Sequence, residues 1–390
     1  MRTPFVFIVF LFWTVVLNAQ QISPSLAESP DWPPECRKVE IKSSMDAQMQ
    51  PAYFYNAGGT ELRPLIVSLH TWSGGYEQKD TLSWMCIERD YHYIHPHFRG
   101  PNNNPDACGS PLAIQDIDDA IAYALDNAGV DTTQIHVIGV SGGGYATLLA
   151  FMKSEYRMAS FSAWVPISDL VNWYTESGAR GRKYAMDIAK STVTWEQYEQ
   201  EKYAFNKDQA VLRSPYYMQT PMCRKNSKLT LYAGIHDGYE GSVPITQSLL
   251  FYNKVVRDYD ISDTDALIPV RDMLDMATLR NFRKHDKKTL GSRVVHYEKM
   301  YKDLLRIFIF EGGHEMLPEV TLDPVPAKRI LAIGDSNGAA ENGWVNQLKK
   351  LRFHDFIYNT SISGNTIGFD NLGDEKLNTL RNVNRYIEDA

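Results

Sequence analysis

Residues 135–144 read Ile-His-Val-Ile-Gly-Val-Ser-Gly-Gly-Gly, and they decide the fold. Apolar residues alternate in the first half of this stretch as they do in a β-strand, and residues 145–150 after it are typical of a helix. Between the two lies Gly-x-Ser-x-Gly, in which Gly139 and Gly143 leave room for a tight turn around Ser141. A strand, a sharp glycine turn and a helix in this order predict a nucleophile elbow rather than an incidental serine in a glycine-rich connection.

Strand-like segments recur along the chain on both sides of this elbow. The predicted strands span residues 38–41, 51–55, 63–70, 91–96, 161–166, 229–233 and 306–310. Helical periodicity is clear at residues 113–128 and 245–259. Strands that alternate with helices favour the α/β class, with a mostly parallel sheet that helices cover on both faces.

Two longer segments interrupt this alternation. Residues 175–217, which are polar and rich in aromatic side chains, and residues 261–301 are interpreted as insertions. They either cover the carboxyl edge of the sheet or decorate the surface. A strand pattern then starts again after a proline-containing linker. The predicted organisation is an entry segment, a main domain, a linker and a C-terminal α/β segment, at residues 20–37, 38–317, 318–328 and 329–390.

The composition predicts a globular protein that does not bind nucleic acid. Of the 390 residues, 44% are hydrophobic and 12% aromatic, which excludes a largely disordered chain. The formal net charge is -7, and no dense run of Lys and Arg offers a surface for nucleic acid.

The N-terminus predicts export. Residues 1–19 combine Arg2, an apolar segment and a small-residue cleavage point, which together are typical of a secretory signal peptide. A retained membrane anchor is the alternative. We therefore expect a secreted or periplasmic protein without stable membrane insertion after cleavage.

Four cysteines are compatible with one or two structural disulfides in an oxidising compartment, although the sequence leaves their pairing open. Their spacing fits neither a zinc ribbon nor a CxxC redox site, so no metal and no cofactor is predicted.

A serine hydroxyl needs a neighbouring base, and that base needs an orienting acid. In this fold class both follow the serine at the carboxyl ends of later strands. Asp237 comes directly after the strand at 229–233, and His314 comes after the strand at 306–310. Ser141, Asp237 and His314 are therefore the predicted triad. Asp169 is the weaker alternative acid, because its strand directly follows the elbow helix.

An oxyanion formed at Ser141 needs two backbone N–H donors. Gly142 is expected to supply one, and the loop after the strand at 63–70 the other, from Thr71 or Trp72. Trp72 offers either a stacking face for substrate or simple packing. Of the remaining histidines, His70 is assigned to this loop. His92, His95 and His97 are assigned to packing or pocket lining, and His236 is expected to lie beside the acid.

Residues 38–317 resemble the catalytic domain of the prolyl oligopeptidase family within the α/β-hydrolases. The supporting stretches are residues 139–144, residues 93–100 and Asp237 with the later residues 242–248. The resemblance implies an α/β-hydrolase fold. The chain departs from the family in a longer loop after the acid, and it has no room ahead of residue 38 for the propeller that often gates peptide access in these peptidases.

The segment after the linker resembles the beginning of an SGNH-type (GDSL-like) esterase, with a flavodoxin-like α/β fold. Gly334-Asp335-Ser336-Asn337 matches its serine block, and residues 358–365 match its second block. The resemblance implies that Ser336 would be a nucleophile and Gly364 an oxyanion amide. Because the later blocks are absent, we expect either a fragment of a longer protein or a remnant without its base, and Ser336 is expected to be inactive as it stands. The alternative is that the Gly-Asp-Ser stretch is a simple turn.

Taken together, the sequence predicts a serine hydrolase that cleaves carboxylic esters through an acyl-enzyme. The expected substrates are small-molecule esters or acyl groups on polysaccharides, because the propeller is missing and an esterase-like segment is attached. A serine peptidase with the same triad is the first alternative. A non-catalytic binding protein is the second, and the intact order of the triad speaks against it.

Overall fold

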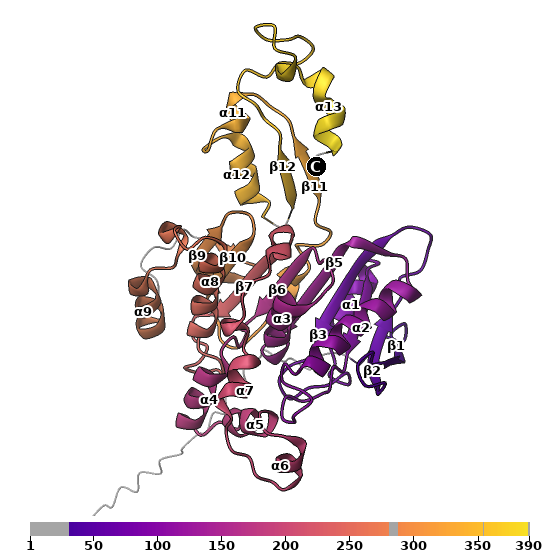
Figure 1. The fold of residues 1–390 in the computed structure, drawn as a ribbon, viewed down its shortest axis with the longest axis vertical. Helices are drawn as coiled ribbons and strands as arrows, with labels where there is room; N and C mark the ends of the chain where they lie inside the picture. The colour runs from indigo at the N-terminus through magenta and orange to yellow at the C-terminus, as the bar shows by residue number, and fades with distance from the viewer. Residues whose placement is uncertain (1–30, 281–287, 354, 389–390) are drawn as a thin grey trace, which may run out of the picture.

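The computed structural model describes residues 31–280, 288–353 and 355–388. Its core is a ten-stranded sheet in the order β1-β2-β4-β3-β5-β6-β7-β10-β9-β8 (Figure 1). Six central strands, from β4 to β10 in this order, run parallel, whereas β2 and β9 run antiparallel to their neighbours. The strands are β1 (Arg37–Lys42), β2 (Met49–Tyr55), β3 (Arg63–Leu69), β4 (His92–Pro96), β5 (Val130–Val140), β6 (Ser160–Trp164), β7 (Lys228–Gly234), β8 (Thr289–Leu290), β9 (Arg293–Tyr301) and β10 (Leu305–Phe310).

Helices cover both faces of this sheet. Successive side chains of a strand point to opposite faces, so Val67 of β3 joins one buried cluster and Ile66 joins the other. The helices of the first cluster are α2 (Pro111–Asn127), α3 (Gly142–Lys153), α8 (Thr246–Tyr259) and α9 (Val270–Leu279), and those of the second are α1 (Thr81–Glu88) and α10 (Pro318–Thr321). The predicted α/β-hydrolase fold is confirmed.

Residues 175–217 form helices that cover the carboxyl edge of the sheet (Figure 1). Trp173 of α4 (Leu170–Ala179), the first of these helices, packs edge-on against Trp72 with ring centroids 4.7 Å apart, so the helices are joined to the loop after β3. The insertion therefore lies over the end of the sheet where Ser141 is found. The helices are α4 (Leu170–Ala179), α5 (Tyr184–Ser191), α6 (Trp195–Glu199) and α7 (Lys207–Leu212).

The interpretation of residues 261–301 as an insertion is wrong for their last part. Strand β9 pairs antiparallel with β10 and extends the sheet, which the sequence analysis ended at β10. The strand was not predicted because Glu298 and Lys299 occupy consecutive half-buried positions in its C-terminal half. These charged residues interrupt the alternation of apolar and polar residues. Short 3₁₀ helices lie at Pro215–Tyr217, Met222–Asn226, Thr264–Ala266 and Glu375–Leu377.

The C-terminal residues form a separate two-stranded parallel sheet of β11 (Arg329–Ala332) and β12 (Phe356–Asn359). Its small core joins Ala332, Val345 and Ile357. Figure 1 shows these elements at the end of the molecule opposite to α4–α7. They meet the main sheet at the start of β7, where the Lys228 ammonium lies 4.9 Å from the centre of the Phe356 ring. The helices of this segment are α11 (Ser336–Ala339), α12 (Trp344–Leu351) and α13 (Thr379–Glu388).

All four cysteines are free thiols in the structure, so the expected disulfides are not formed. Cys36, Cys86 and Cys108 are buried among apolar side chains, and burial raises the pKa of Cys36 to about 12. Among the described residues, no helix has the length and apolar character needed to cross a bilayer. The predicted signal peptide lies outside the described residues, and export stays a prediction.

Candidate active site

Ser141 stands at the sharp turn between β5 and α3, as the elbow motif predicts. Its backbone has φ 59° and ψ −116°, a conformation that is strained for a residue with a side chain. The turn is so tight that a Cβ on Gly139 would lie 2.2 Å from the carbonyl oxygen of Gly143. Ser141 is also the N-cap of α3, where the helix dipole favours negative charge.

Ser141, His314 and Asp237 form a continuous hydrogen-bond chain. The Oγ of Ser141 lies 2.8 Å from Nε2 of His314, and Nδ1 of His314 lies 2.7 Å from Oδ2 of Asp237. The other carboxylate oxygen of Asp237 accepts from the backbone N–H groups of Gly238 at 2.8 Å and Val243 at 3.1 Å. The Asp237 side chain is only 1% exposed, so the acid is held in one orientation.

The acid and the base come from neighbouring strands although 77 residues separate them. Gly234 at the end of β7 is the register partner of Phe310 at the end of β10. The two loops that follow are also joined, because the N–H of His236 donates to the carbonyl of Gly312 at 3.0 Å. Adjacent parallel strands thus deliver both side chains to one point of the carboxyl edge.

Two backbone N–H groups lie close together beside Ser141. A Cβ on Gly142 would sit 2.2 Å from the backbone nitrogen of Trp72, so only a glycine lets these two amides approach. The N–H of Thr71 donates to Oε1 of Gln78 at 3.0 Å, whereas that of Trp72 has no hydrogen-bond partner among the described residues. Of the two alternatives, Trp72 therefore has the available donor.

The Trp72 side chain belongs to the interior. It is 2% exposed, packs against Trp173 and Tyr184, and donates from Nε1 to Oδ2 of Asp187 at 3.2 Å. Its ring therefore packs rather than offering a stacking face to substrate.

Of the other histidines named from the sequence, His70, His92 and His95 are buried in or beside the sheet, whereas His97 and His236 are partly buried. The His70 ring stacks on Phe98 with centroids 3.9 Å apart, and burial lowers the pKa of His70 to about 3. His92 bonds the backbone of Ala57 and Gly129, and His95 lies against other rings. Within the ranges given above, no group of three or more His, Cys, Asp or Glu residues has the arrangement of a metal site.

Asp169, the alternative acid, caps a helix. Its Oδ1 accepts from the N–H groups of Val171 and Asn172 at the start of α4, and its Oδ2 accepts from the Tyr217 hydroxyl at 3.1 Å. This carboxylate is thus occupied away from His314.

A second hydrogen-bonded group beside the triad was not found from the sequence. Glu311 accepts from Nε2 of His236 at 2.8 Å and from Nε2 of His296 at 2.7 Å. Although burial opposes it, these hydrogen bonds hold the pKa of Glu311 below its usual value. His296 lies on β9, a strand that was not predicted, so nothing in the sequence connected His296 with His236.

A cavity of about 390 Å³ opens directly at the reacting groups. Ser141 and His314 line it together with Tyr184 of α5 and Met316. Arg293 of β9 also lines it and forms an ion pair with Glu315 at 2.8 Å. The cavity places side chains of α5 and of β9 around Ser141.

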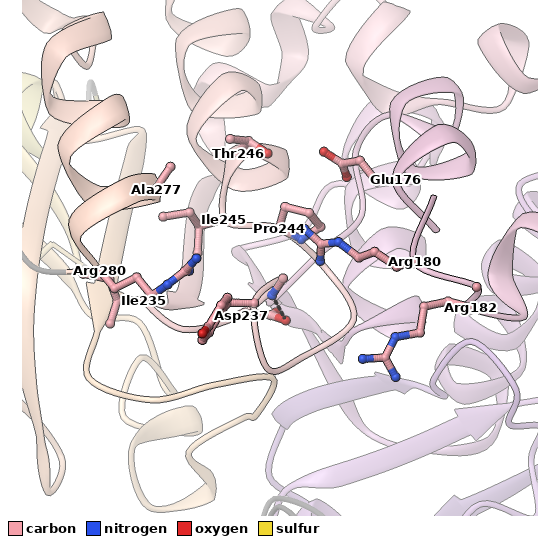
Figure 2. A pocket seen from close by; sticks show the side chains of 13 residues that line it. Glu176, Arg180, Arg182, Ile235, Asp237, Pro244, Ile245, Thr246, Ala277 and Arg280 are labelled. Carbon is pink, nitrogen blue, oxygen red and sulfur yellow. Dashed lines mark hydrogen bonds between the residues drawn. The ribbon is translucent and has the colours of Figure 1, made fainter. Parts of the chain in front are cut away.

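A larger cavity of about 630 Å³ is lined by Asp237 and by Gly238 and Tyr239 of the loop that follows it (Figure 2). Three arginines line it, Arg180 and Arg182 from the turn after α4 and Arg280 from the end of α9. Sequence reasoning singled out none of them.

The C-terminal segment brings its two sequence blocks together, but it holds no second triad among the described residues. Asn365 Nδ2 donates to the carbonyl of Gly334 at 3.2 Å, which places residues 358–365 beside the Ser336 turn. Gly364 has φ 82°. Ser336 is exposed, and its hydroxyl has no hydrogen-bond partner in the part of the chain that the structure describes.

Residues 80–265, just under half of the chain, match the model of the Prolyl oligopeptidase family. Among solved structures, the chain is similar to the uncomplexed acylaminoacyl peptidase of Pyrococcus horikoshii, with 21% identity and a TM-score of 0.41 over 56% of this chain and 34% of that one. It is also similar to a puromycin hydrolase, with 15% identity and a TM-score of 0.44 over 59% and 34%. Prolyl oligopeptidase B from Galerina marginata has 13% identity and a TM-score of 0.44 over 57% and 31%.

The matched part spans about a third of the length of these solved chains. No curated protein matches the chain. The family match supports a serine hydrolase and corrects the expected substrate class. The prediction of a carboxylic ester hydrolase is wrong, because residues 80–265 match a family of peptidases. That prediction relied on the short stretch before residue 38 and on a short C-terminal motif. Neither of them touches the groups around Ser141.

Proposed function

We propose that this protein is a serine peptidase that cleaves a peptide bond with Ser141, His314 and Asp237. The observation that carries the proposal is the match to the Prolyl oligopeptidase family, because residues 80–265 contain both Ser141 and Asp237. The hydrogen-bond chain that joins these residues through His314 supports it.

The proposed reaction begins with attack of Ser141 Oγ on the carbonyl carbon of the scissile bond. His314 Nε2, 2.8 Å away, accepts the hydroxyl proton. Asp237 accepts a hydrogen bond from Nδ1, which fixes the tautomer that leaves Nε2 free to act as the base. The imidazolium then donates its proton to the departing amine. Water, activated by the same histidine, hydrolyses the acyl-enzyme and regenerates Ser141.

The charge that develops on the carbonyl oxygen needs fixed donors. The N–H groups of Gly142 and Trp72 are the proposed pair, because the two amides lie side by side and neither is used elsewhere in the described chain. The N-terminus of α3 adds its dipole at the same point. Removal of one such donor typically lowers kcat by about 10² to 10³.

The cavity beside Ser141 is the proposed site for the substrate residue at the scissile bond. Tyr184 and Met316 offer apolar surface, while Arg293 and Glu315 form an ion pair at its wall. Pockets of this kind combine apolar lining with a few polar groups that fix orientation.

A peptidyl p-nitroanilide, for example one with proline before the scissile bond, tests the proposal. Purified protein is expected to release p-nitroaniline, and Ser141→Ala is expected to lower kcat by at least about 10³-fold. The measurement is the steady-state rate at 405 nm together with mass spectrometry of the peptide product.

Ser336→Ala is the matched control, because Ser336 is exposed and has no described hydrogen-bond partner. It is expected to retain full activity. Cleavage of p-nitrophenyl acetate without cleavage of any peptidyl anilide would contradict the peptidase proposal. The resemblance of residues 329–390 to an SGNH-type esterase stays a prediction, and loss of activity in Ser336→Ala would show that this segment takes part.

A further inference from the structure

The cavity beyond Asp237 has the composition of an anion site. Arg180, Arg182 and Arg280 line it, and none of them forms an ion pair or side-chain hydrogen bond with another described residue. Figure 2 shows Arg180 and Arg280 reaching toward the cavity from opposite sides. Guanidinium groups that have no carboxylate partner are well suited to bind a planar carboxylate through paired hydrogen bonds.

Two backbone features add to this charge. Helix α8 begins at Thr246, which lines the cavity, and no side chain caps its N-terminus. The helix has 14 residues, so its dipole also favours negative charge at this wall. The turn that carries Arg180 and Arg182 is fixed, since the N–H of Arg182 donates to the carbonyl of Ser177 at 2.8 Å.

The floor of the cavity is apolar. Ile235, Pro244, Ile245 and Ala277 line it, and Arg280 lies over the Tyr239 ring with its guanidinium carbon 3.7 Å from the ring centre. An apolar floor beneath a cationic rim suits a carboxylate on an aliphatic stem better than a bare inorganic anion. An acidic residue of a peptide has this combination.

Acidic residues of the cavity do not cancel its charge. Asp237 is committed to His314 and to the amides of Gly238 and Val243. Glu176 is partly buried, and its Oε2 has no hydrogen-bond partner. Burial raises the pKa of Glu176 although the charge of Arg180 opposes this shift, so burial disfavours its charged form.

The cavity is separated from the reacting atoms. The loop after Asp237 forms the wall, since a Cβ on Gly241 would lie 2.2 Å from Asp237 Oδ1 and 2.7 Å from His314 Cβ. Asp237 lines the cavity but Ser141 and His314 do not, so a group bound there contacts neither the nucleophile nor the base. Its binding would therefore act on substrate affinity rather than on the chemical step.

We propose that the cavity lined by Arg180, Arg182 and Arg280 binds a carboxylate of the peptide substrate, at a distance from the scissile bond. This inference rests on the proposed peptidase function, because it takes the substrate to be a peptide. It assigns to the three arginines a preference for negatively charged peptides that the triad itself does not supply.

Binding to the uncleaving Ser141→Ala protein tests the site independently of catalysis. The probes are blocked eight-residue peptides in which one Glu is moved along an Ala/Gly frame, each paired with its Gln twin and measured by calorimetry. We expect at least one Glu peptide to bind about tenfold more tightly than its twin. A neutral peptide with a free C-terminus distinguishes a terminal carboxylate from a side-chain one, and tight binding of either supports the site.

Three variants in the Ser141→Ala background locate the effect. Arg280→Gln is expected to reduce the tenfold preference to about twofold or less, whereas Glu176→Gln is expected to leave it within about twofold, because burial already disfavours the charged form of Glu176. Arg271→Gln is the matched control, since Arg271 is exposed on the same helix outside the cavity. It is expected to leave the preference unchanged.

Equal binding of the Glu and Gln peptides together with weak binding of the peptide with a free C-terminus would overturn the proposal, and so would unchanged binding of the preferred carboxylate in Arg280→Gln. Arginine-dependent binding of inorganic phosphate without any preference for Glu peptides would overturn it as well, since the cavity would then be an inorganic-anion site. If active protein cleaves no peptide but Ser141→Ala shows the arginine-dependent preference, the peptidase function fails and the anion site stands. In active protein, Arg280→Gln is expected to raise KM for acidic peptides about tenfold with kcat unchanged.

Discussion

Gly142 determines whether the backbone around Ser141 can stabilise an anion. Its amide belongs to the first turn of α3, and its Cα faces the backbone of Trp72 so closely that any side chain would meet main-chain atoms. Main-chain atoms cannot move aside as the end of a flexible side chain can. The contact is therefore intolerant of substitution, although Gly142 makes no side-chain interaction.

Gly142→Ala is expected to lower kcat/KM by at least about 10²-fold, because the new Cβ would push the Trp72 amide away from the developing oxyanion. Overpacking at this contact is also expected to reduce the free energy of unfolding by about 1–3 kcal/mol. Steady-state kinetics and urea unfolding check both effects.

Gly178→Ala in α4 is the control, since its Cβ would meet only Ala185 at an ordinary 3.7 Å. It should keep full activity. A Gly142→Ala enzyme with near-normal kcat/KM would show that the two amides are not the oxyanion donors.

The sequence named Ser141, Asp237 and His314 because each follows a strand, and strand ends gather at one edge of a parallel sheet. It left the second amide open between Thr71 and Trp72. The difference between them is a single hydrogen bond from the Thr71 N–H to Gln78, which depends on how the loop folds back. No local pattern carries that information, and the same is true of the contact of Arg293 with Glu315.

At the scale of elements, helix α5 supports the loop that carries Trp72. Asp187 of α5 accepts a hydrogen bond from the indole N–H of Trp72 at 3.2 Å, across 115 residues of sequence. Burial raises the pKa of Asp187, while the charge of Lys183 opposes this. The insertion is thus connected to the active-site loop by a buried polar contact as well as by aromatic packing.

Asp187→Ala is expected to lower kcat about fivefold with a smaller change in KM, because Trp72 loses the bond that holds its position. Asp187→Asn keeps an acceptor oxygen at the same place and is expected to stay within about twofold of the wild-type kcat. Kinetics on one peptidyl anilide decide between them. Equal kcat values for both variants and the wild type would mean that α5 does not position the loop.

Strong periodicity made the long elements predictable, and α2 and α8 lie within two residues of the predicted helix bounds. Strand β9 was not predicted, since charged residues interrupt the alternation of apolar and polar residues along it. As a result, the predicted sheet ended two strands early, before β9 and β8, and His296 and Arg293 were missed with them.

At the scale of the whole molecule, two buried histidines link stability to pH. His70 and His136 are both fully buried, and burial lowers the pKa of each to about 3. In the unfolded chain a histidine titrates near its usual pKa of about 6.5. Between about pH 6.5 and pH 3 the unfolded state therefore binds more protons, so each histidine destabilises the fold as the pH falls.

His136→Gln tests this linkage through the change in unfolding free energy between pH 7.5 and pH 5.0. One such histidine is expected to contribute about 2 kcal/mol of loss over that interval. On acidification, the free energy of unfolding of the variant is therefore expected to fall by about 2 kcal/mol less than that of the wild type, whatever the stability of the variant at pH 7.5. Urea unfolding followed by fluorescence gives both values, and parallel pH profiles would contradict the buried neutral state of His136.

The sequence could not predict how the two sheets are arranged relative to each other. The linker and the restart of the strand pattern predicted a second segment, but its position depends on contacts such as Gln134 Nε2 with the carbonyl of Ala327 at 2.7 Å. These contacts join residues 193 positions apart. They place the C-terminal segment beyond the amino ends of the main strands, whereas helices α4–α7 lie at the carboxyl ends (Figure 1).

The pairing of β7 with β10 has a mechanical consequence. Because the N–H of Ile235 donates to Phe310 and that of His236 donates to Gly312, the loops of the acid and the base share one ladder beyond the ends of their strands. Neither loop can open locally without breaking bonds of the other. Amide hydrogens of both are therefore expected to exchange with solvent at one common rate, as a single cooperative unit. Thermal motion of the helical cover would then leave the Asp237–His314 pair assembled.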